Sequence, residues 1–431
     1  MVNVKKNISI LLVGIIVYFF LTSYRLENYG VIATFLLIIF FTARGVFSCS
    51  NVNYGLSQVF YLFSLFFLGI APLYQYLEGV VFWGAQPFNA DNYLQTNLTL
   101  ILALLVYEFT YKRVFKGKKI ESIINYGLIR PWSVSSYVLL ILSLISSLYI
   151  FVVIFHGNVM GMLIRSSSTD TVAGGALIHL FFIRPMPAIC FLLFKYYKKS
   201  NRIVEFVLFL LMCVTNSPIA IPRFAVAAFY IPLAFIYIRA LQKQYNFALF
   251  MTFALLVIFP LLHLVRASVD EFSIASSFSM MLEGHFDSYQ MLMQVVSTEY
   301  ITWGRQLLGV ILFFVPRGLW ASKPIGSGYL IAHENDYYFD NISMNYFGEG
   351  YVNFGIIGVV LFAVVIGYFN ARMDKKYWLS LYQTPLFVLV FAVTLGMEFV
   401  IMRGALLNML PVYIGYVLAI RLAYRISRVR L

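Results

Sequence analysis

The sequence predicts an all-α, polytopic integral membrane protein with about twelve transmembrane helices. Of its 431 residues, 61% are hydrophobic and only 11% are charged, whereas soluble domains carry about 25% charged residues. The apolar residues form runs that are spread evenly along the chain, and lipid can cover far more apolar surface than a soluble core can bury. We therefore expect residues 1–431 to form a single transmembrane domain.

Twelve apolar segments approach the length of about 20 residues that a helix needs to cross a hydrocarbon core. The predicted spans are 7–24, 30–47, 55–73, 94–111, 134–155, 176–196, 203–217, 223–240, 246–264, 351–369, 384–401 and 404–421. Residues 265–350 stand apart, because they form a connection much longer than a simple turn between two spans. Connections of this length usually carry function.

Lys and Arg are distributed unevenly over the predicted loops. If the N-terminus lies in the cytoplasm and the loops alternate, most of the 31 basic residues lie on the cytoplasmic side, as membrane proteins prefer. This orientation places both termini in the cytoplasm and the 265–350 connection on the outer face. It also explains the net charge of +13, so we expect no nucleic-acid partner.

The 265–350 connection contains two further predicted helices. In the segment Phe278–Val296, polar residues follow one helical stripe and apolar residues mostly follow the other. This pattern is typical of an amphipathic helix that lies in the membrane interface. The segment Leu307–Val315 is apolar but too short to span. We expect it to be either re-entrant or packed on the bundle.

Several basic residues lie inside a span or on the outer side, against the orientation bias. Arg184 is inside a predicted span and next to Pro185, and an ionisable residue at that depth indicates a functional site or a buried ion pair. Arg suits phosphate because its planar fork donates two hydrogen bonds at once. The candidate diphosphate-binding residues are Arg184, Arg223, Arg266, Arg317, Arg165 and Lys323.

Other charged residues have simpler interpretations. Arg403 is expected to be an interfacial anchor or to pair with Glu398. Glu108 and Lys112 are four residues apart, which predicts a structural ion pair on one helix face.

Candidate acid–base and sugar-binding residues lie in the same outer region. The candidate general bases are Asp287, Glu349, His333 and His285, and the sequence does not rank them. Trp320 and Tyr351 are candidates for stacking on sugar rings, with an interfacial aromatic belt as the alternative. The five histidines have no metal-ligand spacing, so we expect no metal and no cofactor.

Three segments of the chain resemble Wzy-type O-antigen and oligosaccharide repeat-unit polymerases. They are GHFDSYQML (284–292), LLGVILFFVPRGLWASKPIGSGYLIA (307–332) and NYFGEGYVNFGIIG (345–358). The stretches NSPIAIPRF (216–224) and IRPMP (183–187) are similar to the same family.

Some members of this family carry an Arg-x10-Gly motif in outer loops. Arg317 and Gly328 match that spacing, whereas Arg165 does not, because position 176 is alanine.

The resemblance implies an activity and a location. Such an enzyme transfers the growing glycan from undecaprenyl diphosphate to the sugar of a new lipid-linked repeat unit. The reaction takes place on the periplasmic face of the bacterial inner membrane, without metal or cofactor, in an architecture similar to the GT-C glycosyltransferases. The implied partners are undecaprenyl-diphosphate-linked repeat units, the lipid bilayer and a chain-length regulator.

Two other functions remain open at this point. An O-antigen ligase uses the same chemistry with lipid A core as the acceptor, and the ligases also have an important histidine in a large outer loop, as His333 would be here. A non-enzymatic polysaccharide flippase or transporter is the third hypothesis, although such proteins usually show repeat symmetry and short loops.

Overall fold

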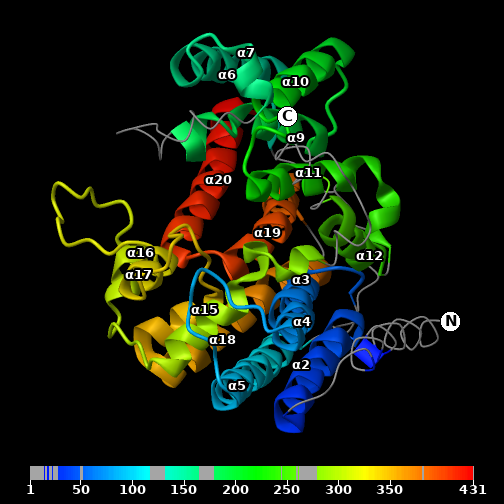
Figure 1. The fold of residues 1–431 in the computed structure, drawn as a ribbon. Helices are drawn as coiled ribbons and strands as arrows, with labels where there is room; N and C mark the ends of the chain where they lie inside the picture. Colours follow the sequence, from blue (N-terminus) through cyan, green and yellow to red (C-terminus); the bar gives the residue numbers. More distant parts are fainter. Residues whose placement is uncertain are drawn as a thin grey trace.

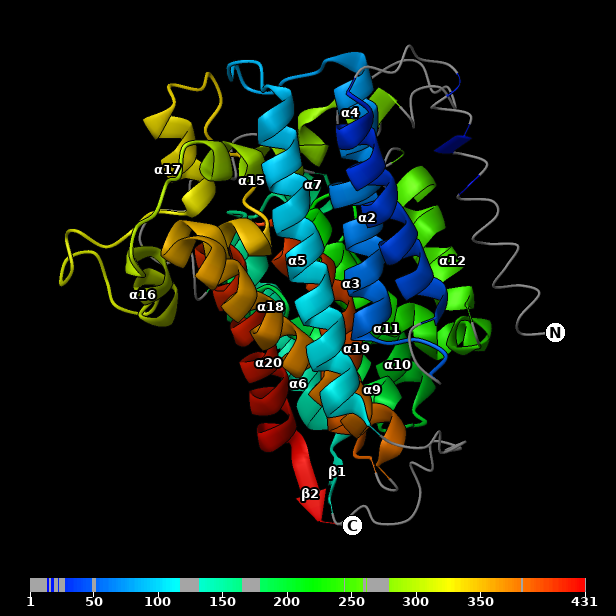
Figure 2. The ribbon, with the colours of Figure 1, turned by 90° about the horizontal axis from the view of Figure 1, so that it is seen from below.

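The structure is a computed structural model that describes residues 14, 17, 18, 22, 28–48, 52–116, 132–164, 179–243, 245–258, 261, 279–380 and 383–430. Within these ranges the chain is a bundle of helices (Figure 1) with one small pair of strands (Figure 2). The predicted span 7–24 and the candidate residues Arg165 and Arg266 lie outside the described residues, apart from isolated positions of that span.

The elements follow one another along the chain, with η marking 3-10 or π segments. They are α2 (Tyr29–Ser48), α3 (Leu56–Leu65), η1 (Phe66–Ile70), α4 (Ala71–Glu78), α5 (Ala90–Phe115), β1 (Trp132–Val134), α6 (Ser136–Tyr149), η2 (Ile150–Ile154), α7 (Val159–Leu163), η4 (His179–Ile183), α9 (Met186–Tyr196), α10 (Arg202–Thr215), α11 (Arg223–Tyr237), η5 (Arg239–Gln242), α12 (Asn246–Phe253), η6 (Ala254–Ile258), η7 (Met280–Leu282), η8 (Gly284–Phe286), α15 (Ser288–Ser297), α16 (Arg305–Ile311), α17 (Ser327–Glu334), α18 (Tyr346–Leu379), α19 (Pro385–Arg403), α20 (Leu406–Ser427) and β2 (Arg428–Arg430).

Six helical stretches of the described residues are long and apolar enough to cross a membrane. They are Tyr29–Phe47, Leu56–Glu78, Ser136–Ile154, Tyr346–Leu379, Pro385–Arg403 and Leu406–Ser427. Each overlaps a predicted span, so the structure agrees with an all-α membrane protein. The shorter apolar helices Ala225–Tyr237 and Asn246–Ile258 also coincide with predicted spans. The total of twelve spans stays a prediction.

One end of the bundle, which we call the Asp374 end, is organised by a buried carboxylate. Asp374 of α18 is fully buried and accepts hydrogen bonds from the backbone N–H groups of Leu56 (2.8 Å) and Ser57 (3.2 Å) and from the Tyr111 hydroxyl (2.8 Å). A carboxylate at this position satisfies the free N–H groups at the start of α3 and interacts favourably with its helix dipole. The antiparallel pair β1–β2 lies at the same end (Figure 2).

The opposite end contains the segment that was predicted to be an interfacial amphipathic helix, and that prediction is wrong. Residues 279–297 form η7, η8 and α15, and both sides of α15 are buried. Gln290 donates to the Val80 carbonyl (2.8 Å) and accepts from the Phe82 N–H (3.0 Å), and Gln294 donates to the Asn335 side chain (2.7 Å). Asp287, Gln290 and Gln294 of the polar stripe therefore bind other parts of the protein, whereas Ser279 and Glu283 are exposed.

Two features of α16 and α18 shape this end. Helix α16 packs against α18 and α20. The first part of the predicted apolar stretch 307–315, which lies in α16, is therefore packed on the bundle. Helix α18 has a sharp bend at Phe354–Gly355, where Gly355 has a φ of +59°. Beyond the bend the two arms touch so closely that a Cβ atom on Gly358 would collide with the Gly350 carbonyl. The first two turns of α18 are thereby packed against the rest of the same helix.

Candidate functional site

The three segments that carry the family resemblance meet at the end of the bundle opposite Asp374. The Ser288 and Ser343 hydroxyls are 3.1 Å apart, and the Asn345 side chain donates to the Ser288 carbonyl at 2.6 Å. The Leu307 N–H donates to the Asn353 side chain at 2.7 Å. Residues 284–292, 307–332 and 345–358 therefore form one packed unit, although they are separate in the sequence.

Two buried carboxylates lie within this unit. Together with their side-chain partners they form what we call the carboxylate cluster, which consists of Trp83, Asp287, Ser327, Ser343, Glu349 and Arg403.

Asp287 is 1% exposed, and both of its oxygens have partners. Oδ2 accepts from the Trp83 indole N–H (3.2 Å) and the Ser343 backbone N–H (3.1 Å). Oδ1 accepts from the Ser343 hydroxyl and lies 3.6 Å from Nη2 of Arg403. With its oxygens occupied in this way, Asp287 holds neighbouring segments together and does not offer an open base to a substrate.

Glu349 has a similar role on the other side of the cluster. It is 1% exposed and accepts from the Ser327 hydroxyl (2.9 Å) and from the backbone N–H of Leu406 (2.8 Å), the first residue of α20. The carboxylate thus caps the N-terminus of α20, where a negative charge is favourable. Its position indicates that Glu349 sets the start of α20.

Arg403 is a member of the cluster that the sequence analysis did not assign to the site. Besides facing Asp287, its Nε donates to the His285 carbonyl at 3.0 Å. Its predicted partner Glu398 instead accepts from Asn370 at 2.7 Å. No local pattern reveals the pairing of Arg403 with Asp287, because the two residues are distant in the chain.

The remaining candidates for acid–base and stacking roles differ in accessibility. His333 is exposed on the last turn of α17, whereas the side chain of His285 is half-buried. Tyr351 is only 6% exposed, so its ring offers no open face to a sugar. Trp320 is half-buried, and its indole N–H donates to the Ser322 hydroxyl at 3.1 Å.

Arg317 and Lys323 stabilise the loop between α16 and α17, which extends from the body of the protein (Figures 1 and 2). Arg317 donates to the carbonyls of Lys323 (2.8 Å) and Pro324 (3.1 Å). The Lys323 ammonium donates to the carbonyls of Phe313 (2.6 Å) and Val315 (2.9 Å), just after α16. Desolvation, together with the nearby Arg317 charge, lowers the pKa of Lys323.

The Arg-x10-Gly spacing has a structural explanation in this loop. The Arg317 side chain links the outgoing and returning parts of the loop through its hydrogen bonds. Gly328 lies where the loop returns to the bundle. A Cβ atom at position 328 would collide with the Ile342 carbonyl oxygen. Arg317 and Gly328 therefore mark the two points at which this loop is held.

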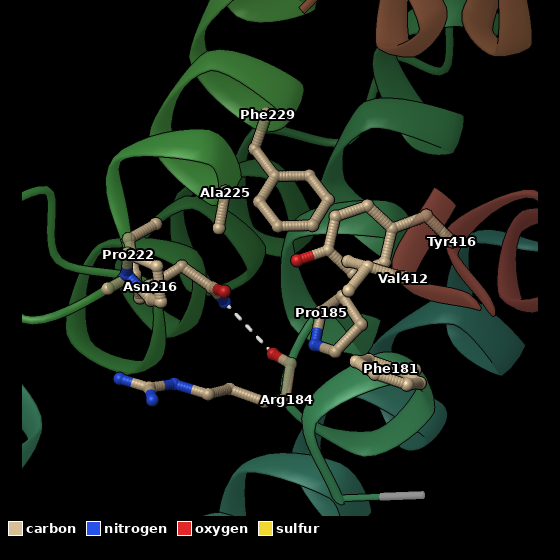
Figure 3. Close-up of a pocket in the computed structure, with 10 residues that line it drawn as sticks. Phe181, Arg184, Pro185, Asn216, Pro222, Ala225, Phe229, Val412 and Tyr416 are labelled. Carbon is tan, nitrogen blue, oxygen red and sulfur yellow. Dashed lines mark hydrogen bonds between the residues drawn. The ribbon is translucent and has the colours of Figure 1, made fainter. Parts of the chain in front are cut away.

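Arg184 lies at the edge of a separate cavity of about 60 Å³. The cavity walls are mostly apolar and come from η4, α11 and α20 (Figure 3). The lining residues are Phe181, Arg184, Pro185, Asn216, Ile221, Pro222, Ala225, Phe229, Val412 and Tyr416.

The predicted span 176–196 is interrupted at this cavity, between η4 and α9. The Arg184 carbonyl accepts from the Asn216 side chain at 3.2 Å, and its guanidinium lies 5.4 Å from the centre of the Phe155 ring. Figure 3 shows this guanidinium pointing away from the aromatic wall of the cavity. Pro222, which lines the same cavity, directly precedes Arg223, the first residue of α11.

Helix α20 connects the cavity with the carboxylate cluster. Leu406 at its start contacts Glu349, and Val412 and Tyr416 line the Arg184 cavity. At 1.5 Å per helical residue, the two places are about 9–15 Å apart along the helix. The carboxylate cluster and the Arg184 cavity thus lie along one helix. Arg317 and Lys323 belong to neither group and stabilise the loop between α16 and α17.

No three His, Cys, Asp or Glu side chains gather at metal-binding distance in the ranges that the structure describes. The expectation of a reaction without metal therefore stays a prediction. Comparison with known proteins found no matching family model, no matching curated protein and no matching solved structure.

Proposed function

We propose that this protein is a membrane glycosyltransferase of the Wzy type, which polymerises undecaprenyl-diphosphate-linked oligosaccharide repeat units. The observation that carries the proposal is the convergence of residues 284–292, 307–332 and 345–358 into one packed unit. Segments that resemble the same family thus lie together in the fold, as the parts of one functional site would.

The proposed reaction is a transfer between two lipid-linked glycans. A hydroxyl oxygen of the incoming repeat unit attacks the anomeric carbon of the growing chain. The bond from that carbon to the diphosphate breaks, and undecaprenyl diphosphate leaves with the electron pair. The hydroxyl proton passes to a base, for which His333 is the candidate because its side chain is exposed.

Arg184 and Arg223 are the proposed diphosphate-binding residues. Arg184 is among the lining residues of a largely apolar cavity, and Arg223 directly follows Pro222, another lining residue. Near such apolar surroundings a charge-assisted hydrogen bond to an anion is stronger than in bulk water. Negative charge grows on the diphosphate as it leaves, so such contacts would stabilise the transition state. Asp287 and Glu349 are positioning residues in this scheme, because their oxygens hold Arg403 and the start of α20.

The proposed orientation places the carboxylate cluster on the periplasmic face and the Asp374 end in the cytoplasm, in a twelve-span arrangement similar to GT-C enzymes. Single cysteines test this in a chain whose Cys49, Cys190 and Cys213 are replaced by serine. An impermeant thiol reagent should label Glu334→Cys in intact cells, and Lys116→Cys only after lysis. The reverse pattern would refute the orientation.

A deletion strain distinguishes the proposed polymerase from an O-antigen ligase. The ligase is the second candidate because ligases have an important histidine in a large outer loop, and His333 is exposed. Loss of a polymerase should leave lipid A core carrying single repeat units. Loss of a ligase should remove both long and short chains from lipid A. A normal ladder of chain lengths in the deletion strain would contradict both functions.

A further inference from the structure

A second pair of polar side chains is buried between α18 and α19, away from the carboxylate cluster. Asn370 and Glu398 are both fully buried. The Asn370 amide donates to Glu398 Oε1 at 2.7 Å and to the Tyr107 hydroxyl at 3.2 Å. The amide thereby uses its two N–H groups, one toward α19 and one toward α5.

The other two oxygens of this pair are acceptors without a donor. Glu398 Oε2 and Asn370 Oδ1 are buried and have no hydrogen-bond partner among the described residues. A buried acceptor that lacks a donor costs about 1–3 kcal/mol, and more if it is charged. Two such atoms within one hydrogen-bonded pair indicate that a donor is missing between them.

The surroundings of Glu398 supply no positive charge within the described part of the chain. The titratable side chains that interact with it are Tyr107 of α5, Tyr346 and Asp374 of α18, and Tyr413 of α20. These are phenols and another acid. Arg403, on the same helix, faces Asp287. A carboxylate ion would therefore be buried in a membrane helix without a counter-ion, which is costly.

We propose that Glu398 is a proton-binding site inside the membrane domain, and that its Oε2 carries a proton which it donates to Asn370 Oδ1. The protonated acid and the amide then form two reciprocal hydrogen bonds, one in each direction, and all four of their oxygen and nitrogen groups are satisfied. The pair ties α18 to α19. Those are the two helices that deliver Glu349 and Arg403 to the carboxylate cluster.

Glutamine is the test substitution, because its amide has the shape of a protonated glutamate and supplies the same donor. We expect Glu398→Gln to keep the melting temperature of the full chain in lipid nanodiscs within about 1 °C of the wild type. Glu398→Ala and Asn370→Ala each remove one partner, so each should lower it by about 3 °C or more.

Exchanging the acid and the amide gives a matched control. Asn370→Asp alone places two acids opposite each other, and we expect it to lower the melting temperature. Combining it with Glu398→Gln restores one acid and one amide and should recover most of that loss. Failure of the double variant to recover stability, or failure of Glu398→Gln to fold, would overturn the proposal.

Infrared spectroscopy detects the proton directly. The wild-type spectrum minus that of Glu398→Gln should contain the carbonyl band of a neutral carboxylic acid. A carboxylate band in its place would show that Glu398 is ionised. A bound monovalent cation is the competing explanation. A melting temperature that depends on sodium concentration in the wild type but not in Glu398→Gln would therefore also overturn the proposal.

Discussion

Arg403 lies with its Nη2 atom 3.6 Å from Oδ1 of Asp287, while Glu398, five residues earlier in the same helix, bonds to Asn370. Five residues correspond to about 140° around a helix, so the two side chains leave α19 on different faces. Arg403 consequently joins α19 to the segment before α15, and Glu398 joins it to α18. One helix thus stabilises two separate polar clusters.

The ion pair between Asp287 and Arg403 should be energetically coupled. Asp287 is 1% exposed and Arg403 35% exposed at the side chain, so Arg403→Ala removes the cationic partner of a buried carboxylate. We expect it to cost about 1.5–3 kcal/mol of unfolding free energy, and Arg403→Lys to cost less. A double-mutant cycle with Asp287→Asn measures the coupling. Additivity within about 0.5 kcal/mol would contradict the pairing. Arg305→Ala, at an exposed arginine, is the control.

Gly328 should tolerate no side chain. A Cβ atom there collides with the Ile342 carbonyl oxygen, which belongs to the backbone and cannot rotate away. Gly328→Ala should therefore destabilise the protein by about 1–3 kcal/mol, as overpacking does. Gly318 in the same loop has open space around it, so Gly318→Ala should change stability by less than about 0.5 kcal/mol. Equal melting temperatures for the two variants would refute the close contact at Gly328.

Tyr337 should make stability fall at alkaline pH. Burial raises its pKa to about 12, above the value of about 10 for an unfolded chain. The folded state therefore retains the phenol proton while the unfolded state loses it, so this contribution to stability decreases as the pH rises from 10 to 12.

The comparison of wild type with Tyr337→Phe isolates that residue from the other tyrosines. The hydroxyl is buried and has no partner among the described residues. Tyr337→Phe should therefore be at least as stable as the wild type at neutral pH and should lose less stability between pH 10 and 12. Parallel pH profiles for the two proteins would contradict this.

Arg184 should affect activity more than folding. Arg184 is a proposed ligand of the leaving diphosphate, so Arg184→Ala should lower the polymerisation rate about ten- to a hundred-fold at unchanged protein level. Arg184→Lys keeps the charge but loses the planar fork and should rescue only in part. The readout is the chain-length ladder in a complemented deletion strain, with Arg202→Ala at the start of α10 as the control. Loss of the protein itself would instead indicate a structural role.

Local sequence patterns were enough to predict the long helices and one ion pair. Apolar runs located the long helices, and the spacing of Glu108 and Lys112 predicted an ion pair that the structure confirms, with Arg44 as a second partner. Helical spacing is enough for such pairs, because residues four apart are neighbours on one face.

The candidate site was less predictable, for physical reasons. A stripe of polar residues looks the same in sequence whether its partners are lipid headgroups or other parts of the protein, so the buried partners of Gln290 and Gln294 were not predicted. Sequence patterns also do not reveal that Arg317 and Lys323 bond to backbone carbonyls. Whether a cation is available to a substrate depends on contacts that only the folded chain forms.

The most direct measurement of the central claim is polymerisation by the purified protein. The full chain is reconstituted in lipid vesicles with undecaprenyl-diphosphate-linked repeat units as the only glycan, in the presence of a metal chelator. We predict products that grow by whole repeat units, with release of undecaprenyl diphosphate, and polymerisation about ten- to a hundred-fold slower in Arg184→Ala. Recovery of unchanged substrate, or transfer only after lipid A core is added, would contradict the assignment as a polymerase.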